Sequence, residues 1–162
     1  MSLHLTRSVL YLPASNARAV EKARGLACDV AILDLEDAVA PEAKPQARAA
    51  AVAAVRAAGF APRLGVRING LDTAWGADDL AALYDAGAAL IVAPKVETPE
   101  QVGSLSARLP AGCALWAMIE TPRAVLDVAR IAGAGGALGG LMLGLNDLAK
   151  ALGTGPSPDR EP

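Results

Sequence analysis

Short aliphatic runs alternate with longer alanine-rich stretches along almost the whole chain. The aliphatic runs have the length and composition of buried strands, whereas the alanine-rich stretches have the Gly and Pro boundaries of helices. This alternation is typical of βαβ units on a parallel sheet. We expect strands at 8–12, 30–33, 64–68, 89–92, 114–119 and 141–143, and helices at 17–24, 41–58, 77–86, 98–108 and 124–132.

Polar or charged residues follow almost every expected strand. In a parallel α/β fold the carboxyl ends of the strands meet at one edge, where such folds build their sites. An open doubly wound sheet is one alternative, but no Gly-x-Gly-x-x-Gly follows the first strand. A TIM-type (β/α) barrel fits the strand ends better. Since about six of the eight βα units are present, we expect a single domain over residues 1–162 that is C-terminally incomplete and lacks the last two units.

The composition narrows the classes of partner. The chain has 15 Lys and Arg against 17 Asp and Glu, so it lacks the basic excess of a nucleic-acid-binding protein. Residues 1–7 lack a signal-peptide core, and no apolar run is long enough to span a bilayer. Cys28 and Cys113 have no metal-ligand spacing and read as small core residues in a reducing compartment. We expect a cytoplasmic protein without nucleic-acid or membrane partners.

Glu120 is the first candidate for chemistry, because an apolar run ends at its carboxylate. Thr121 and Pro122 then begin a helix, since Thr is a good N-cap and Pro is tolerated at the first helical position. A buried strand has no structural need of an acid at its end, so we expect Glu120 to bind a cation. The alternative is an ordinary acid at a helix N-terminus, where it favours the macrodipole.

Asp147 follows the next expected strand, so its carboxylate and that of Glu120 are expected to be neighbours. His4 is the sole histidine and is far from any strand end, which disfavours Ser-His-Asp and Cys-His mechanisms and a zinc site. Oxygen ligands suit Mg²⁺, which keeps several waters and needs one or two protein carboxylates. Alternatively, Asp147 caps a helix over 148–150.

Arg67 is the candidate for anion binding. Its guanidinium matches a carboxylate bidentately, and a strand end would hold it rigid. Mg²⁺ and Arg at the same end of the barrel indicate a 2-oxo- or hydroxy-carboxylate substrate. A Lewis acid stabilises the enolate that forms when a carbon–carbon bond of such a substrate breaks. In the structural alternative, Arg67 and Lys95 form a ring of ion pairs with Asp34, Glu36 or Asp37.

Other polar and aromatic residues have ordinary structural explanations. We interpret Asp78 and Asp79 as a solvated helix start, Glu97 as a solvated or first-turn acid, Trp75 and Trp116 as packing residues, and 133–140 as a flexible connection.

Six short motifs occur in order over nearly the whole chain: RSVLYLP at 7–13, LDLEDAV at 33–39, VRIN at 66–69, PKVE at 94–97, MIET at 118–121 and LGLNDL at 143–148. Together they resemble the citrate lyase β-subunit-like family. This is the CoA-ester lyase branch of the HpcH/HpaI aldolase superfamily, which also contains malyl-CoA and citramalyl-CoA lyases. One motif alone is weak, but six in register are specific.

The resemblance implies a (β/α)₈ barrel assembled as a homotrimer or hexamer. It implies Mg²⁺ held by Glu120 and Asp147, and a substrate carboxylate or oxo-acid held by Arg67. It also implies two further strands and a C-terminal segment whose Asp reaches a neighbouring subunit's site. Tyr11, Asn16 and Lys22 match positions near substrate or CoA in malyl-CoA lyases, with Asn16 in place of an Arg, while Asp34, Glu36, Asp37 and Lys95 would order Arg67 and the metal's waters.

These features favour a Mg²⁺-dependent carbon–carbon lyase that acts on a hydroxy- or oxo-acyl-CoA by a retro-aldol or retro-Claisen route. A pyruvate-type class II aldolase acting on a free carboxylic acid is the alternative within the enzymes, although it would need a His base at a strand end. A non-catalytic truncated barrel fragment is the alternative from another class.

Overall fold

The computed structural model describes residues 6–154 and shows one sheet of six parallel strands. The strand order follows the sequence from β1 to β6, as successive βα units require. Each expected strand is therefore present, with shifted ends. The strands are β1 (Val9–Pro13), β2 (Val30–Asp34), β3 (Arg63–Arg67), β4 (Leu90–Ala93), β5 (Ala114–Ile119) and β6 (Leu138–Leu143).

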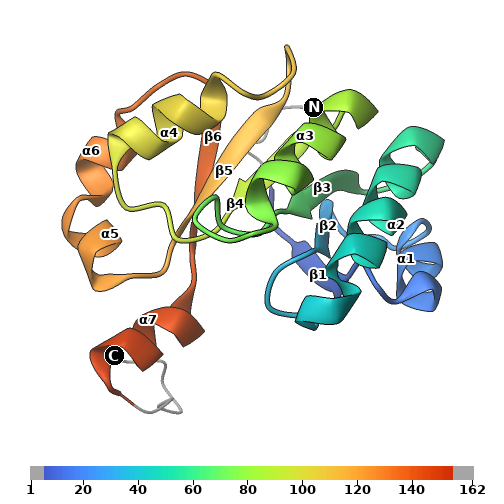
Figure 1. Ribbon diagram of the computed structural model, residues 1–162, viewed down its shortest axis with the longest axis horizontal. Coiled ribbons are helices and arrows are strands. Elements are labelled where there is room, and N and C mark those ends of the chain that lie inside the picture. The colour runs from blue at the N-terminus through green and yellow to red at the C-terminus, as the bar shows by residue number, and fades with distance from the viewer. Residues whose placement is uncertain (1–5, 155–162) are drawn as a thin grey trace.

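Helices follow every strand and return the chain to the start of the next one (Figure 1). Thr121 accepts a hydrogen bond from the Ala124 N–H at 3.1 Å, and Pro122 is the first residue of the helix, which confirms the expected start. The helices are α1 (Ala17–Ala23), the 3₁₀ turn η2 (Pro41–Ala43) with α2 (Lys44–Ala57), α3 (Gly76–Ala86), α4 (Pro99–Ser106), α5 (Pro122–Leu126), α6 (Val128–Ala132) and α7 (Leu145–Leu152).

Alternate residues of each strand point to the two faces of the sheet. On β2, Ala31 and Leu33 join the larger core beneath the helices, whereas Val30 and Ile32 join a smaller core on the inner face. Burial on both faces explains why β2, β4 and β5 read as continuous apolar runs, whereas β1 and β6 at the edges of the sheet are partly exposed. The inner core contains Val30, Ile32, Leu90, Val92, Trp116 and Met118, with Tyr11 and Met142 packed against it.

Trp116 occupies the inner core, as its interpretation as a packing residue requires. Gly140 of β6 faces it, and a Cβ added at Gly140 would lie 3.0 Å from the indole ring. The interpretation of 133–140 as a flexible connection was therefore wrong at its end. Residues 138–140 belong to β6, where the missing side chain of Gly140 makes room for the indole.

Two further expectations about elements need correction. The expected helix over 124–132 is divided at Asp127 into α5 and α6. Asp competes for backbone hydrogen bonds within a helix and is better suited to a helix end, which is where Asp127 lies. The alternative in which Asp147 caps a helix over 148–150 is also wrong, because α7 begins at Leu145 after Gly144, and Asp147 lies in its first turn.

The sheet is curved but not closed. Within residues 6–154, β1 and β6 each pair with one neighbour, although their inner sides approach each other. The Tyr11 hydroxyl of β1 donates to the Met142 sulfur of β6 at 3.3 Å. None of the helices in these residues has the length and apolarity needed to cross a bilayer.

Candidate active site at the strand ends

Glu120 lies directly after β5 and is only 2% exposed. Its Oε1 accepts a hydrogen bond from the backbone N–H of Lys95 at 2.8 Å. A Cβ at Gly144 would lie 2.6 Å from the Glu120 Cβ, so the glycine after β6 allows the carboxylate its place. Burial raises the pKa of Glu120, and the nearby charges of Glu36 and Asp147 act in the same direction.

Asp147 reaches the same region from the first turn of α7. Its Oδ2 lies 3.5 Å from the Lys95 ammonium, and its charge contributes to the raised pKa of Glu120. Lys95 therefore contacts both acids, Glu120 through its backbone N–H and Asp147 through its ammonium. Glu120 directly follows β5, whereas Asp147 lies in the helix after β6, and their role in binding a cation stays a prediction.

Arg67, the last residue of β3, is buried and contacts three acids, namely Asp34 at the end of β2 and Glu36 and Asp37 after that strand. Its Nε and Nη2 donate to the two oxygens of Asp34, each at 2.7 Å. Its Nη1 lies 2.9 Å from Glu36 Oε2 and 3.5 Å from Asp37 Oδ2. The ion pairs of the structural alternative are therefore present, and the bidentate face of Arg67 holds Asp34. The Nη1 side faces Glu36 and Asp37, so a bound anion would have to displace one of these acids to reach Arg67.

Glu36 connects Arg67 to Lys95. Its Oε1 accepts a hydrogen bond from the Lys95 ammonium at 2.8 Å, whereas its buried Oε2 contacts Arg67 without hydrogen-bond geometry. Burial raises the pKa of Glu36 despite both cations. Burial alone would lower the pKa of Lys95, but Glu36 and the more distant Asp147 and Asp37 raise it.

The lowered pKa of Asp34 makes the stability of the fold depend on pH in the acidic range. Burial alone would raise its pKa, but the hydrogen bonds and charge of Arg67 and the N–H groups of Glu36 and Ala38 lower it below the ordinary 3.8. A carboxyl whose pKa is lower in the folded chain stabilises the fold fully above its unfolded pKa, and loses that contribution as pH falls through the folded pKa.

We therefore expect the free energy of unfolding to decline below about pH 3.8, and Asp34→Asn to flatten that decline. Urea unfolding between pH 5 and pH 2 measures both slopes. The same acid slope in the variant and in the wild type would contradict this assignment.

Tyr11 adds an aromatic wall from β1. Its ring centroid lies 5.3 Å from the Arg67 guanidinium carbon, within reach of a cation–π contact. Burial, and to a lesser extent the acids Asp34, Glu120 and Glu36, raise the pKa of Tyr11 to about 12. The phenol therefore stays protonated at neutral pH and can donate a hydrogen bond.

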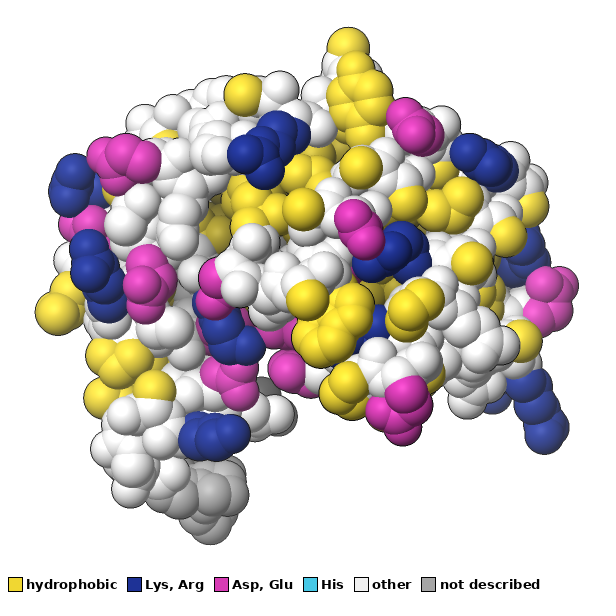
Figure 2. All heavy atoms as spheres, in the orientation of Figure 1, with side chains coloured by type: hydrophobic (Ala, Val, Ile, Leu, Met, Phe, Trp, Pro, Cys, Tyr) yellow, Lys and Arg dark blue, Asp and Glu magenta, His cyan; other side chains and the backbone are white. Residues whose placement is uncertain are grey.

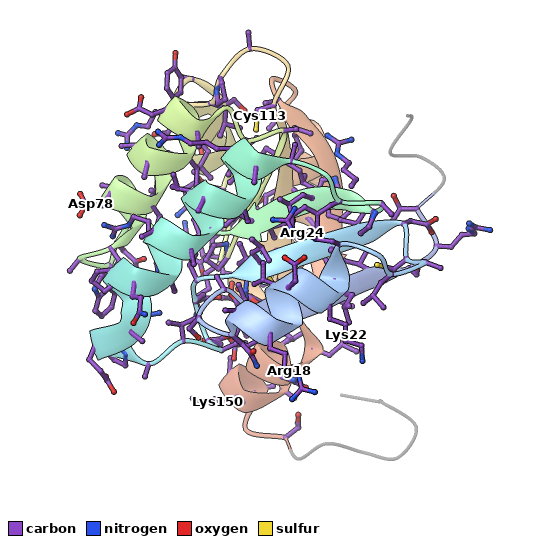
Figure 3. The ribbon with its side chains drawn as sticks, turned by 90° about the vertical axis from the view of Figure 1, so that its right-hand side faces the viewer. Arg18, Lys22, Arg24, Asp78, Cys113 and Lys150 are labelled. Atoms are coloured by element: carbon purple, nitrogen blue, oxygen red, sulfur yellow. The ribbon has the colours of Figure 1, made fainter. Side chains whose placement is uncertain are left out.

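Asn16 and Lys22 lie on α1, apart from the acids. The Asn16 side chain caps α1 by accepting the Ala19 N–H at 3.0 Å, so part of its polarity has a structural use. Lys22 is exposed one turn after Arg18, and Figure 3 shows both projecting from α1. These two residues are candidates for a ligand that extends out of the strand-end cluster.

Sequence reasoning missed a buried polar network beside the acids. The Lys44 ammonium donates to the carbonyls of Leu35 and Glu36, both at 2.9 Å, and to Asn69 Oδ1 at 2.6 Å. It therefore ties the acidic segment after β2 to the loop after β3. Helical spacing could have revealed the burial of Lys44, because Lys44 shares a face of α2 with the buried Ala47 and Ala51.

Asp79 completes this network, contrary to its interpretation as a solvated residue. It is 0% exposed, its Oδ2 accepts from the Asn69 N–H and side-chain amide, and its Oδ1 accepts from Arg48. Its position four residues before the buried Leu83 was the available signal. Asp78 is exposed at the outer edge of α3, as expected (Figure 3).

The strand ends carry more negative than positive charge. The carboxyls of Asp34, Glu36, Asp37 and Asp147 share the cations of Arg67 and Lys95, and Glu120 accepts the backbone N–H of Lys95 beside them. In the space-filling view, acidic and basic side chains gather at the lower centre, above α7 (Figure 2). A divalent cation would reduce the excess of negative charge, and carboxylate oxygens are the ligands that Mg²⁺ prefers.

The donor set fits such an ion. Among the described residues, no group of three or more His, Cys, Asp or Glu side chains has the placement of a complete metal cage. Mg²⁺ does not require one, because it keeps several waters and is often bound by one or two carboxylates together with the substrate. Glu120 and Asp147 match that requirement.

A cavity of about 310 Å³ lies next to this cluster. Its walls come from the segments after β3 and β4 and from α4, and they include Asn69, Lys95 and Glu97. Glu97 is held there, since its Oε1 accepts the Thr121 hydroxyl at 2.7 Å. The walls do not include Arg67, Glu120 or Asp147, so the acids lie beside this cavity and not within it.

Known proteins are similar to this chain in sequence and in fold. A family model described as HpcH/HpaI aldolase/citrate lyase matches residues 7–161. A (3S)-malyl-CoA thioesterase of Cereibacter sphaeroides (strain KD131 / KCTC 12085) is 47% identical over 97% of this chain and 55% of its own length. The L-malyl-CoA/beta-methylmalyl-CoA lyase of Rhodobacter capsulatus is 35% identical over 92% of this chain and 51% of its own.

A solved structure extends the comparison to the fold. The CitE protein of Mycobacterium tuberculosis, in complex with magnesium, acetoacetate and coenzyme A, superposes with a TM-score of 0.80 at 36% identity. The match covers 98% of this chain and 57% of that one, and it confirms the expected TIM-type (β/α) architecture. The chain spans about half the length of the curated relatives it matches.

Proposed function

Because the chain belongs to the HpcH/HpaI aldolase/citrate lyase family, we propose that it acts with Mg²⁺ to cleave a carbon–carbon bond in a hydroxy- or oxo-acyl-CoA. One observation carries the proposal. A buried carboxylate, Glu120, is held at a strand end by a backbone N–H and has a second carboxylate, Asp147, as its neighbour. The magnesium in the related CitE structure supports this reading.

Glu120 and Asp147 would hold the metal. When bound there, Mg²⁺ supplies a Lewis acid that favours negative charge on a carbonyl or alkoxide oxygen. The chain's own cations act on the same charge. Arg67 is fixed by Asp34, and its Nη1 contacts Glu36 and Asp37, so a carboxylate of the acyl group would bind Arg67 by displacing one of these two acids from Nη1. The Tyr11 phenol lies beside it as a hydrogen-bond donor.

Coenzyme A needs contacts beyond the acids. Arg18 and Lys22 stand one turn apart on the exposed side of α1, with Asn16 at its start, and two cations so placed suit a pyrophosphate or phosphate. We propose that α1 binds this part of the cofactor, and the coenzyme A in the CitE complex supports the choice.

Carbon–carbon cleavage of malyl-CoA needs no second reactant. A base removes the hydroxyl proton, the carbon–carbon bond between the carbinol carbon and the carbon next to the thioester breaks, and the electron pair moves into the thioester enolate. Protonation of that carbon gives acetyl-CoA, and the other fragment leaves as glyoxylate.

Hydrolysis of the thioester is the second candidate, because a relative at 47% identity is named a malyl-CoA thioesterase. Hydrolysis consumes water and gives malate and free coenzyme A. The charge cluster suits both reactions, since each develops negative charge on the oxygen of a thioester carbonyl.

Product analysis distinguishes the candidates. With malyl-CoA and Mg²⁺, we expect glyoxylate, trapped as its phenylhydrazone, together with acetyl-CoA and no free thiol. Release of free thiol and malate would show hydrolysis of the thioester and would contradict the lyase proposal. Turnover of free malate or a free 2-oxo acid alone would favour the aldolase alternative. Neither product from any substrate, in a chain that is folded by circular dichroism, would favour the non-catalytic alternative.

The expected single domain over residues 1–162, the homotrimer or hexamer and the cytoplasmic location stay predictions. Sedimentation velocity of the full chain measures the assembly directly. An assembly of three or six chains would agree with the resemblance, and a monomer would contradict it.

A further inference from the structure

Lys95 has an unusual backbone conformation at the centre of the candidate site. Its φ is +50°, and Ala58 is the other non-glycine residue with positive φ among residues 6–154. Side chains with a Cβ disfavour this left-handed region, so the surrounding structure must hold Lys95 in it. Such conformations cluster at functional sites.

The conformation directs the amide of Lys95 at Glu120. The N–H of Lys95 donates to Glu120 Oε1 at 2.8 Å, while the next N–H, of Val96, donates to the Met118 carbonyl of β5 at 3.2 Å. The segment after β4 is thereby fastened to β5 on both sides of the turn. Glu120 therefore depends on the backbone of Lys95 for its orientation.

The side chain of the same residue acts on the other acid. The Lys95 ammonium lies 2.8 Å from Glu36 Oε1 and 3.5 Å from Asp147 Oδ2. A cation so near Asp147 attracts that carboxylate and repels any second cation that approaches it. The backbone and the side chain of Lys95 thus touch the two carboxylates proposed to bind the metal.

We propose that Lys95 is a positioning residue with two opposed effects on the metal site. Its left-handed backbone orients Glu120 and strengthens the binding of a divalent cation, whereas its ammonium competes with that cation for Asp147. In the chain without metal, the ammonium holds Glu36 and Asp147 close, and metal binding releases Asp147 from it. This inference rests on the proposed metal site at Glu120 and Asp147.

Three substitutions of the full 162-residue chain separate the two effects. Lys95→Gln removes the charge and leaves the same backbone strain. Lys95→Gly removes the charge and the strain together, and Lys95→Ala removes the charge but keeps a Cβ in the left-handed region. Lys150→Ala is the matched control, since it removes one positive charge from the exposed side of α7.

The dissociation constant for Mn²⁺, measured by electron paramagnetic resonance of the free ion, is the readout. We expect Lys95→Gln to bind Mn²⁺ about tenfold more tightly than the wild type, because a competing unit charge is lost. We expect Lys95→Gly to bind about fivefold more tightly than Lys95→Ala, because glycine keeps the amide directed at Glu120. Lys150→Ala should match the wild type.

A second measurement needs no metal. In urea with a chelator, Lys95→Gly should be at least as stable as Lys95→Ala, the reverse of the usual order for these residues. This comparison also reports whether each variant is folded. A less stable glycine variant would overturn the backbone effect.

The outcomes separate this inference from the proposed function. A wild-type chain that binds no Mn²⁺ would overturn both. Wild-type binding combined with unchanged or weaker binding by Lys95→Gln would overturn the competition by the ammonium and leave the metal site intact. Equal affinities of Lys95→Gly and Lys95→Ala for Mn²⁺ would overturn the backbone effect and leave the metal site intact.

Discussion

Glu120→Gln and Asp147→Asn are each expected to weaken Mg²⁺ or Mn²⁺ binding by more than about 100-fold, because substitutions one step removed from a metal already cost 10–100-fold. Both substitutions keep the size of the side chain and remove a negative oxygen ligand. Turnover of the acyl-CoA substrate should fall with metal affinity. Isothermal titration calorimetry measures the binding, and the product assay measures the turnover.

Asp85→Asn is the matched control, because Asp85 is an exposed acid near the end of α3 and takes no part in the cluster. We expect its metal affinity and turnover to equal those of the wild type. Retained metal binding in Glu120→Gln would refute the assignment of the metal to this strand end. If Glu120→Gln weakens metal binding and Asp147→Asn does not, then Glu120 binds the metal and Asp147 does not.

Asp34→Ala is expected to lower the free energy of unfolding by about 3–5 kcal/mol, the range for removing one partner of a buried ion pair. The Asp34 carboxylate accepts two hydrogen bonds from Arg67 and one each from the N–H groups of Glu36 and Ala38. Its removal leaves these donors without their acceptor in a buried place. Urea unfolding at neutral pH measures the loss.

The exposed pair of Arg130 and Asp127 provides the comparison. Arg130 is 65% exposed, and such pairs contribute between about 0 and 1 kcal/mol. Arg130→Ala should therefore cost less than about 1 kcal/mol. A similar small loss in Asp34→Ala would mean that Arg67 finds other partners, with Glu36 and Asp37 the nearest candidates.

Local pattern was sufficient for the elements and for the main candidate residues. Aliphatic runs bounded by Gly and Pro predict the six strands, and those at the centre of the sheet are apolar throughout because both of their faces are buried. The Thr-Pro pair predicts the start of α5, since capping depends on neighbouring residues alone. The order of the strands then brings Glu120 and Asp147 together, because parallel strands end at one edge of the sheet.

Interactions between distant segments decided what each charged side chain does. The position of Asp79 near the start of α3 suggests a solvated acid. Its carboxylate is instead buried and accepts hydrogen bonds from Asn69 and Arg48, which lie outside α3. Arg67 was expected to offer its bidentate face to a substrate, but Asp34 occupies that face from the neighbouring strand. These pairings have no signal in sequence spacing, since their partners are between 10 and 33 residues apart and meet only when the sheet forms.

The amino-acid sequence by itself therefore determined the repeated βα units, the edge at which the polar residues gather and the acids that could bind a cation, because periodicity and capping are local. The tertiary structure alone decided which carboxylate each cation holds, and it alone revealed the left-handed Lys95 that connects Glu120 to Asp147. Those features arise where buried and partly buried charges from several segments must satisfy one another in a small volume.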